Sequence, residues 1–115
     1  MTGAIDSYQF GRITIGGREY TEDIIIFPDR VKDGWWRKSG HRLCLEDIAE
    51  VIAASPKTLV VGTGASGLME VLDEVRRAAD DNGIELIAET TDEACRTYNR
   101  LRRSRRVAAA LHLTC

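Results

Sequence analysis

The stretch from Thr58 to Leu72 constrains the fold of this 115-residue chain more than any other. It opens with a short apolar and β-branched run, which is typical of a strand buried on both faces of a covered sheet. Three glycines follow at the G-x-G-x-x-G spacing and predict a tight turn with unobstructed backbone N–H groups: Gly62, Gly64 and Gly67. The helical pattern directly after the turn predicts a helix whose positive N-terminus points into the space beyond it.

The N-terminal third of the chain predicts a β-hairpin. The apolar stripe from Tyr8 to Ile15 shifts phase at Gly11, which we interpret as a β-bulge. Gly16–Gly17 is the signal for a two-residue hairpin turn. We expect the return strand to run from Tyr20 to Phe27, where Pro28 stops it, and to enter the centre of a larger sheet.

The rest of the chain alternates between helical and extended patterns. Apolar residues at helical spacing predict a helix around residues 45–52 and a second helix whose buried stripe is Leu68, Leu72, Val75 and Ala79. Residues 84–88 form a short strand pattern, Thr90 or Thr91 begins a third helix with Glu93 in capping-box register, and residues 107–114 predict a closing strand. We therefore expect one α/β domain over residues 1–115, with helices packed on a mixed central sheet plus the N-terminal hairpin.

Composition limits the classes of partner. A net charge of -2 gives the molecule no bulk attraction for nucleic acid or for anionic membranes, so we expect neither as a partner. Residues 1–6 lack the basic and apolar regions of a secretory signal, and no apolar run approaches the roughly 20 residues of a membrane span. Three cysteines are an odd and sparse set that favours a reducing compartment, and we expect a cytoplasmic protein.

The glycine turn allows two interpretations. Glu89 lies 22 residues after Gly67, close to where a dinucleotide fold places its ribose-binding carboxylate. The turn could thus bind a small anion, a phosphate or a nucleotide. The alternative is that the glycines only permit a tight turn and close packing of a helix on the sheet. The hypothetical ligand-binding residues are the turn and two nearby cationic candidates: Gly62, Thr63, Gly64, Gly67, Arg37 and His41.

Metal binding and covalent catalysis have weaker signals. The spacing His-x-x-Cys occurs twice, at His41–Cys44 and His112–Cys115, and two cysteines with two histidines is a known zinc composition. On a strand, however, positions i and i+3 face opposite sides, and a chain with its own core has no need of a structural metal. No zincin, P-loop or nucleophile-elbow pattern is present. We therefore expect no metal, no cofactor and no catalytic residue.

Two further segments are candidates for binding surfaces. Six arginines fall from Arg96 to Arg106. One interpretation is a face that binds RNA or an acidic partner. The other is the solvated side of a helix, paired with the acidic stretch of residues 70–93. Trp35, Trp36 and Arg37 combine the residue types that dominate binding hot spots. Adjacent tryptophans in a strand face opposite sides, so one can enter the core while the other covers a surface; the alternative is that both close the core.

Several short motifs together resemble one family. They are Tyr8-x-Phe-Gly11, Gly17-x-x-Tyr20, the strand beginning at Asp23, Trp36-Arg37, Gly62-Thr-Gly64, Thr91-x-x-Ala94, Tyr98-Asn99 and Leu111-His-Leu-Thr-Cys115. The chain is similar over nearly its whole length to the Mth-type domain family, which includes an adipogenesis-associated protein and a mitochondrial complex I assembly factor. The resemblance implies a three-layer α/β fold, one strand running against the others, and a cleft near Gly62, Thr63 and Gly64. No enzymatic activity is established for the family as a whole, so the resemblance leaves the function open.

Two hypotheses about function follow. The favoured one is a non-catalytic protein-interaction or assembly-type module that binds an unknown protein partner through Trp35, Trp36 and Arg37. The alternative is a protein, or an enzyme, that binds a small ligand or phosphate at the Gly62–Gly67 loop. The sequence leaves the oligomeric state open.

Overall fold

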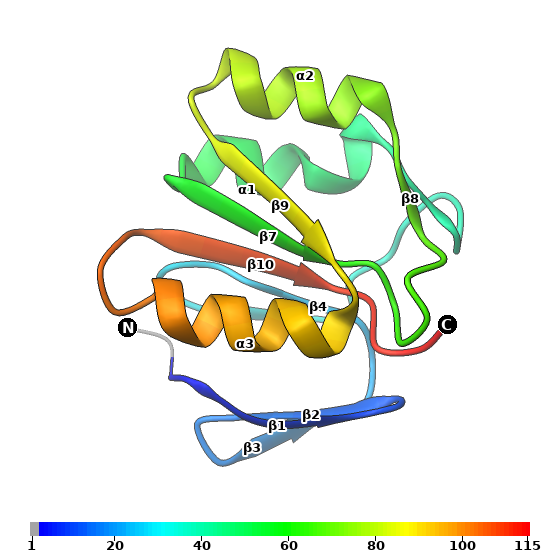
Figure 1. The fold of residues 1–115 in the computed structure, drawn as a ribbon, viewed down its shortest axis with the longest axis vertical. Helices are drawn as coiled ribbons and strands as arrows, with labels where there is room; N and C mark the ends of the chain where they lie inside the picture. Colours follow the sequence, from blue (N-terminus) through cyan, green and yellow to red (C-terminus); the bar gives the residue numbers. More distant parts are fainter. Residues whose placement is uncertain (1–2) are drawn as a thin grey trace.

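The computed structural model describes residues 3–115 and shows three layers around a five-stranded sheet (Figure 1). The strand order is β5 (Val31–Asp33), β4 (Ile24–Ile26), β10 (Val107–Leu111), β7 (Thr58–Gly62) and β9 (Glu85–Glu89). Strands β10, β7 and β9 are mutually parallel, while β4 is antiparallel to both of its neighbours. Strand β4 therefore runs against the other four, which confirms the predicted mixed sheet.

One face of the sheet is covered by helices. They are the 3-10 turn η1 (Leu45–Ile48), α1 (Ala49–Ala54) and α2 (Asp73–Asp81). Beside them, β6 (Arg42–Leu43) and β8 (Glu70–Val71) form a short parallel pair. The apolar core of this layer joins Ile48, Val51 and Val75 to side chains of β7 and β10, and it includes Trp35.

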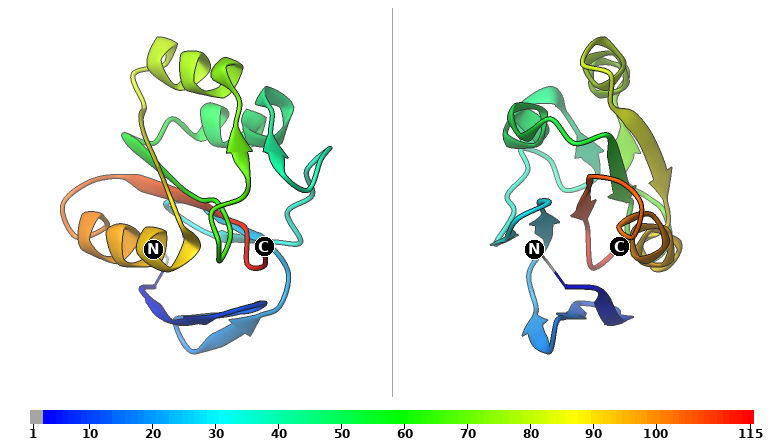
Figure 2. Two further views of the ribbon diagram at one scale, coloured as in Figure 1. Left: turned by 45° about the vertical axis from the view of Figure 1, so that its right-hand side comes forward. Right: turned by 90° about the vertical axis from the view of Figure 1, so that its left-hand side faces the viewer.

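The opposite face is covered by α3 (Thr91–Leu101) and by a separate antiparallel sheet of β1 (Ile5–Gln9), β2 (Arg12–Ile15) and β3 (Arg18–Tyr20) (Figure 2). Asn99 of α3 holds β1 in place: its side chain accepts from the backbone N–H of Ile5 and donates to the Ile5 carbonyl, both at 2.8 Å. A second apolar core fills the space between these elements and the central sheet. This three-layer arrangement agrees with the fold that the family resemblance implied.

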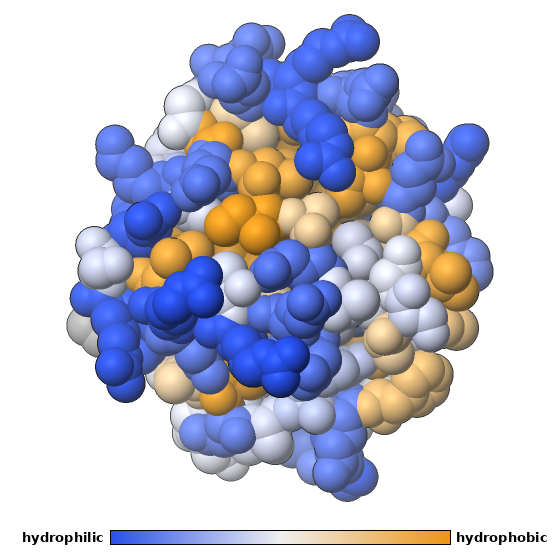
Figure 3. All heavy atoms as spheres, viewed as in Figure 1, coloured by the Kyte–Doolittle hydropathy of each residue, from blue (hydrophilic) through white to orange (hydrophobic). Residues whose placement is uncertain are grey.

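Burial follows the position of each strand. Every residue of β7 and of β10 is buried, as expected for central strands with both faces covered. Strand β9 lies at the edge, and Figure 3 shows apolar surface over it, between α2 and α3, framed by charged side chains. Glu85 and Glu89 end this strand, and charged residues on an edge discourage pairing with another chain.

Two predictions for the N-terminal region were wrong. Gly11 lies in the turn between β1 and β2 with φ of +78°, and the register shift occurs instead between Ile5 and Ser7. The return strand is not continuous, because β3 ends at Tyr20 and β4 begins at Ile24 in a different sheet. The Gly16–Gly17 turn is confirmed, since both glycines have the positive φ that a tight hairpin turn requires.

The predicted start of the helix after the glycine turn was also wrong. Helix α2 begins at Asp73, and the segment before it is extended. The amides of Glu70 and Leu72 donate to the carbonyls of His41 and Leu43, so residues 70–72 join the β6 strand instead of a helix. Leu68, which we expected in the buried stripe, is 58% exposed. By contrast, α3 begins where predicted, with Thr90 as N-cap and its hydroxyl 2.8 Å from Glu93.

Across residues 3–115, every helix is too short or too polar to cross a membrane.

Candidate functional site

Three segments meet at the carboxyl end of the parallel strands. They are the glycine turn after β7, the residues after β10 from His112 to Cys115, and the loop from Trp35 to Gly40 (Figure 1). In open α/β sheets this edge is where ligands usually bind. The three segments carry the hypothetical ligand-binding residues and the tryptophan segment, except His41, which is exposed in the following turn.

The backbone amides of the glycine turn already have acceptors. Thr63 donates to the carbonyl of Glu89 at 2.8 Å, and Gly64 donates to the hydroxyl of Thr91 at 2.9 Å. The next amide, of Ala65, donates to the carbonyl of Thr114 at 2.8 Å. Two more close the turn on itself, from Gly67 to Gly64 and from Met69 to Thr63. These amides therefore do not form a free cradle for an anion.

The space that the missing side chains leave is also filled. A Cβ at Gly62 would lie 2.9 Å from atoms of both Leu111 and Thr91. At Gly64, where φ is +105°, a Cβ would lie 2.9 Å from the carbonyl oxygen of Thr114 and 3.0 Å from the ring of His112. Both glycines therefore allow close packing of the chain on itself.

The prediction of unobstructed amides at this turn was wrong for a physical reason. Buried N–H groups need acceptors, and the segment after β10 together with the start of α3 supplies them. The helix that should have pointed its N-terminus at the turn begins six residues after Gly67. Ligand binding by Gly62, Thr63, Gly64 and Gly67 stays a prediction without this support.

A buried ionic network joins the other two segments. Asp23 accepts from Arg37 Nη1 at 2.8 Å and from His112 Nδ1 at 2.7 Å, both through Oδ2, while Oδ1 accepts from the Leu113 amide at 2.7 Å. His112 Nε2 donates to the Cys115 carbonyl. The side chains of Arg37 and His112 are only 5% and 7% exposed. Buried charges of this kind are stable only when they are paired, as they are here.

The network raises the pKa of His112 and lowers the pKa of Asp23. Hydrogen bonding to Asp23 raises the pKa of His112 above its usual value, against the effect of burial, and the Cys115 carbonyl adds to the rise. Burial alone would raise the pKa of Asp23, but hydrogen bonds from His112, Leu113 and Arg37 outweigh it and lower that pKa. The ring nitrogens of His112 face the Asp23 carboxylate and the Cys115 carbonyl, while the guanidinium of Arg37, whose Nη2 lies 3.0 Å from Nδ1, acts in the opposite direction on the pKa of His112.

The two tryptophans separate completely. Trp35 is 5% exposed, lies in the helical-side core and donates from Nε1 to the Asp47 carbonyl at 3.0 Å. Trp36 is 85% exposed. The guanidinium of Arg37 lies 4.8 Å from the Trp35 ring, and its Nε atom is buried without a hydrogen-bond partner among the described residues. The segment is not a strand, but the predicted division between core and surface is the one observed.

Beside Trp36 the surface is hollowed. The hollow has a volume of about 430 Å³ and is lined by Glu22, Asp23, Gly34, Trp35, Trp36, Arg37, Lys38 and Gly40. We call it the Trp36 hollow. Arg37 therefore belongs to the tryptophan segment and the ionic network, and its nearest link to the glycine turn is through His112.

Cys44 and Cys95 lack the lowered pKa of a nucleophilic thiol. Burial raises the pKa of Cys95 to about 12, and burial together with the Asp47 carboxylate raises the pKa of Cys44. Thiols with raised pKa values are poor nucleophiles. Within residues 3–115, no three histidine, cysteine or acidic side chains come together in a way that could hold a metal ion.

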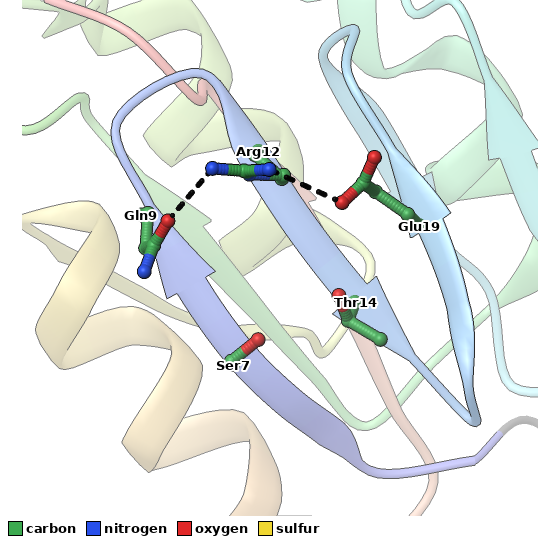
Figure 4. A pocket seen from close by; sticks show the side chains of 5 residues that line it. All are labelled: Ser7, Gln9, Arg12, Thr14 and Glu19. Atoms are coloured by element: carbon green, nitrogen blue, oxygen red, sulfur yellow. Dashed lines mark hydrogen bonds and ion pairs between the residues drawn. The ribbon is translucent and has the colours of Figure 1, made fainter.

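The arginine run is partly neutralised by the acidic stretch, as the second interpretation of it predicted. Arg96 pairs with Asp92 at 3.1 Å and Arg105 with Glu85 at 2.9 Å. A second hollow, on the outer face of the β1–β3 sheet, is polar and is lined by Ser7, Gln9, Arg12, Thr14 and Glu19 (Figure 4). Its one cation, Arg12, spans the hollow's rim between Gln9 and Glu19.

Sequence reasoning named Asp23 only as the start of a strand and considered His112 as a zinc ligand. The two residues are 89 positions apart, and no local pattern links them. A signal was nevertheless present, because each borders an apolar strand, and a charged residue at the end of a buried strand needs a partner.

The comparisons agree with the fold. The model of a protein family of unknown function, DUF498/DUF598, matches residues 5–112. Solved structures that are similar include the conserved hypothetical protein PH1505 of Pyrococcus horikoshii, with 29% identity over 96% of this chain and 98% of the other and a TM-score of 0.83. Rpa2829 of Rhodopseudomonas palustris shares 32% identity over 95% and 82%, with a TM-score of 0.77.

A third neighbour gives the fold a name. A Bordetella pertussis protein described as a Mth938-like domain has 22% identity, covers 96% of this chain and 85% of its own, and superposes with a TM-score of 0.69, which shows likeness of fold alone. The chain belongs to the DUF498/DUF598 family, the Mth-type domain family of uncharacterised small proteins.

Proposed function

We propose that this protein is a non-catalytic protein-interaction module of the assembly type, and that its docking surface is Trp36 with the Trp36 hollow. We further propose that it works in the cytoplasm, a reducing compartment that suits its three free cysteines.

The observation that carries the proposal is an exposed indole on a fixed support. Trp36 is 85% exposed, while Trp35 before it is anchored in the core and Arg37 after it is held in the ionic network. The backbone on both sides of Trp36 is thus held before any partner arrives, so binding orders little additional chain. Tryptophan and arginine are also the residue types most often found at binding hot spots.

Other exposed apolar side chains border the same end of the molecule. Phe10 is 65% exposed and precedes Gly11, whose amide donates to the Leu113 carbonyl. Leu68 follows Gly67 in the glycine turn, which packs on Thr114 through Gly64. Phe10 and Leu68 thus add exposed apolar side chains to the loops at this end of the molecule.

A photo-crosslinking experiment tests the proposal. A benzophenone side chain at position 36, in cells expressing the protein, should give one discrete adduct, whereas the same group at Asp81, exposed on α2, should not. With the crosslinked partner purified, Trp36→Ala should weaken binding at least tenfold, as expected of a hot spot worth about 2 kcal/mol. Adducts of equal number and yield from both positions, or a Trp36→Ala variant that binds normally, would contradict the proposal.

The alternative function, binding of a small ligand or phosphate at the Gly62–Gly67 loop, gains no specific observation. The amides it requires donate within the chain, and Arg37 is committed to Asp23.

A further inference from the structure

The Trp36 hollow has a charge balance that selects among partners. Three of its lining side chains carry charges that already have partners: Asp23 pairs with Arg37 and with His112 in the buried network, and Lys38 pairs with Glu46 at 2.6 Å. Glu22 is the exception. It is exposed and makes no ion pair or hydrogen bond within residues 3–115.

Glu22 and Trp36 line the same hollow. The Oε1 atom of Glu22 would lie 4.0 Å from a Cβ at Gly34, two residues before Trp36, and both side chains line the hollow. An unpaired carboxylate attracts a cation, and the face of an indole ring attracts one as well. Within the hollow, Arg37 packs on the ring of Trp35. The ring of Trp36 is exposed, so its face is open to a cation from a partner.

We propose that the Trp36 hollow binds an exposed arginine or lysine side chain of a partner protein, with its charged group against Glu22 and its aliphatic stem along Trp36. This inference rests on the proposed function and names the chemistry of the partner. The wide opening of the hollow suits a long, flexible cationic side chain, whose stem buries apolar surface while its head keeps contact with water.

A pair of peptides separates charge from shape. The probe is acetylated glycyl-arginyl-glycinamide, and its control replaces arginine by citrulline, which has the same shape without the charge. In ¹⁵N-labelled protein, the arginine peptide should shift the Trp36 indole resonance with a dissociation constant of about 1 mM, as expected for a single side chain. The Trp35 indole lines the same hollow but is buried and hydrogen-bonded to Asp47, so it should shift less than the Trp36 indole.

Matched variants locate the charge. Glu22→Gln should weaken binding of the arginine peptide about five- to tenfold, because a carboxylate binds a cation far better than an amide does. Asp81→Asn removes the same charge from α2 and should change the affinity less than about twofold. Trp36→Ala should abolish the binding.

Four results would overturn the inference. They are equal binding of the citrulline peptide, equal weakening by Asp81→Asn, and no shift of the Trp36 indole at about 10 mM arginine peptide. The fourth is a Trp36 shift that depends on protein concentration without peptide and is lost in Arg103→Gln, which would make a second copy of this chain the occupant. If the peptide fails while crosslinking at position 36 still captures a partner, the interaction module stands and only the charge assignment falls.

Discussion

The glycine turn and the tryptophan segment lie at the same end of the sheet, yet one is closed and the other is open. The turn has no side chains at three positions, but the chain's own residues fill the space and bond its amides. The tryptophan segment carries two of the largest side chains, but only one of them is buried. An absence of side chains therefore does not make a binding site, because buried backbone groups recruit partners from the chain itself.

The ionic network explains how one segment can close while the other stays open. Asp23 binds His112 and the Leu113 amide on one side, which fixes the residues that cover the glycine turn. On its other side it binds Arg37, which fixes the loop that presents Trp36. One carboxylate thus positions both regions, so substitutions can test each region separately and also the link between them.

The tryptophans should show the largest contrast. Trp35→Ala should destabilise the protein by about 3–5 kcal/mol, since it removes a buried aromatic side chain and leaves the Asp47 carbonyl unpaired. Trp36→Ala should change stability by less than about 0.5 kcal/mol, as is usual for an exposed position. Urea unfolding of both variants measures the difference, and equal losses of stability would remove the distinction between anchor and docking residue.

Removing the link should be nearly as damaging. We expect Asp23→Asn to lower the free energy of unfolding by about 3 kcal/mol, because Arg37 is left as a buried cation without a counter-charge and His112 loses its charged hydrogen-bond partner. Thermal unfolding followed by circular dichroism gives the value. As a control, Glu22→Gln next to it should be nearly neutral, since Glu22 is exposed. A similar loss of stability in Glu22→Gln would mean that any negative charge in this loop stabilises the protein, and not the specific pairing of Asp23 with Arg37 and His112.

Closure of the glycine turn is tested by a pair of glycines. Both Gly64 and Gly83 have positive φ, but a Cβ would meet three atoms of residues 112–115 at Gly64 and nothing within 4 Å at Gly83. Gly83→Ala should therefore show only the backbone effect of about 1 kcal/mol. Gly64→Ala should lose about 2–4 kcal/mol, because overpacking adds to that effect. If the two variants unfold at the same denaturant concentration, the space around Gly64 accommodates a Cβ and the turn is not closed by residues 112–115.

The network predicts how stability changes with pH. The pKa of His112 is raised in the folded protein, so its contribution is complete below the unfolded value of 6.5 and is lost as pH rises through the folded pKa. The pKa of Asp23 is lowered, so its contribution is complete above 3.8 and is lost as pH falls through the folded pKa. The network should contribute most between these two values, and His112→Gln should flatten the decline on the alkaline side of a melting-temperature series.

The smallest expected effect concerns anions. Phosphate, nucleotides and flavins should leave the melting temperature unchanged, since the turn amides and Arg37 already have partners. A ligand at 100 times its dissociation constant would stabilise the protein by about 2.7 kcal/mol, which a thermal-shift assay detects. A saturable increase that Gly62→Ala removes would restore the ligand-binding hypothesis for Gly62, Thr63, Gly64 and Gly67.

The sequence was a good guide where the pattern is local. The apolar run before Gly62, the Gly16–Gly17 turn and the start of α3 at Thr90–Thr91 are where we predicted them, because periodicity and turn chemistry act over a few residues. The same is true of the contrast between Trp35 and Trp36, which follows from their adjacency.

Long-range pairing was where prediction failed. Residues 68–72 have a helical pattern, but the backbone of residues 41–43 captures them as an extended segment, and tertiary hydrogen bonds override the local preference. The candidate site failed in the same way. The Thr114 carbonyl accepts from the Ala65 amide, about 50 positions away, and Asp23 pairs with His112, about 90 positions away. Local sequence patterns do not predict contacts over such separations.

The place of β10 in the sheet has a consequence for how the protein is made. This strand comes last along the described chain, yet it lies in the middle of the sheet, between β4 and β7. Until the ribosome has released it, β4 and β7 lack the strand that joins them, and both are apolar on both faces. Nascent chains should therefore remain open and dependent on chaperones until residues 107–111 emerge, and should then close in one late, cooperative step.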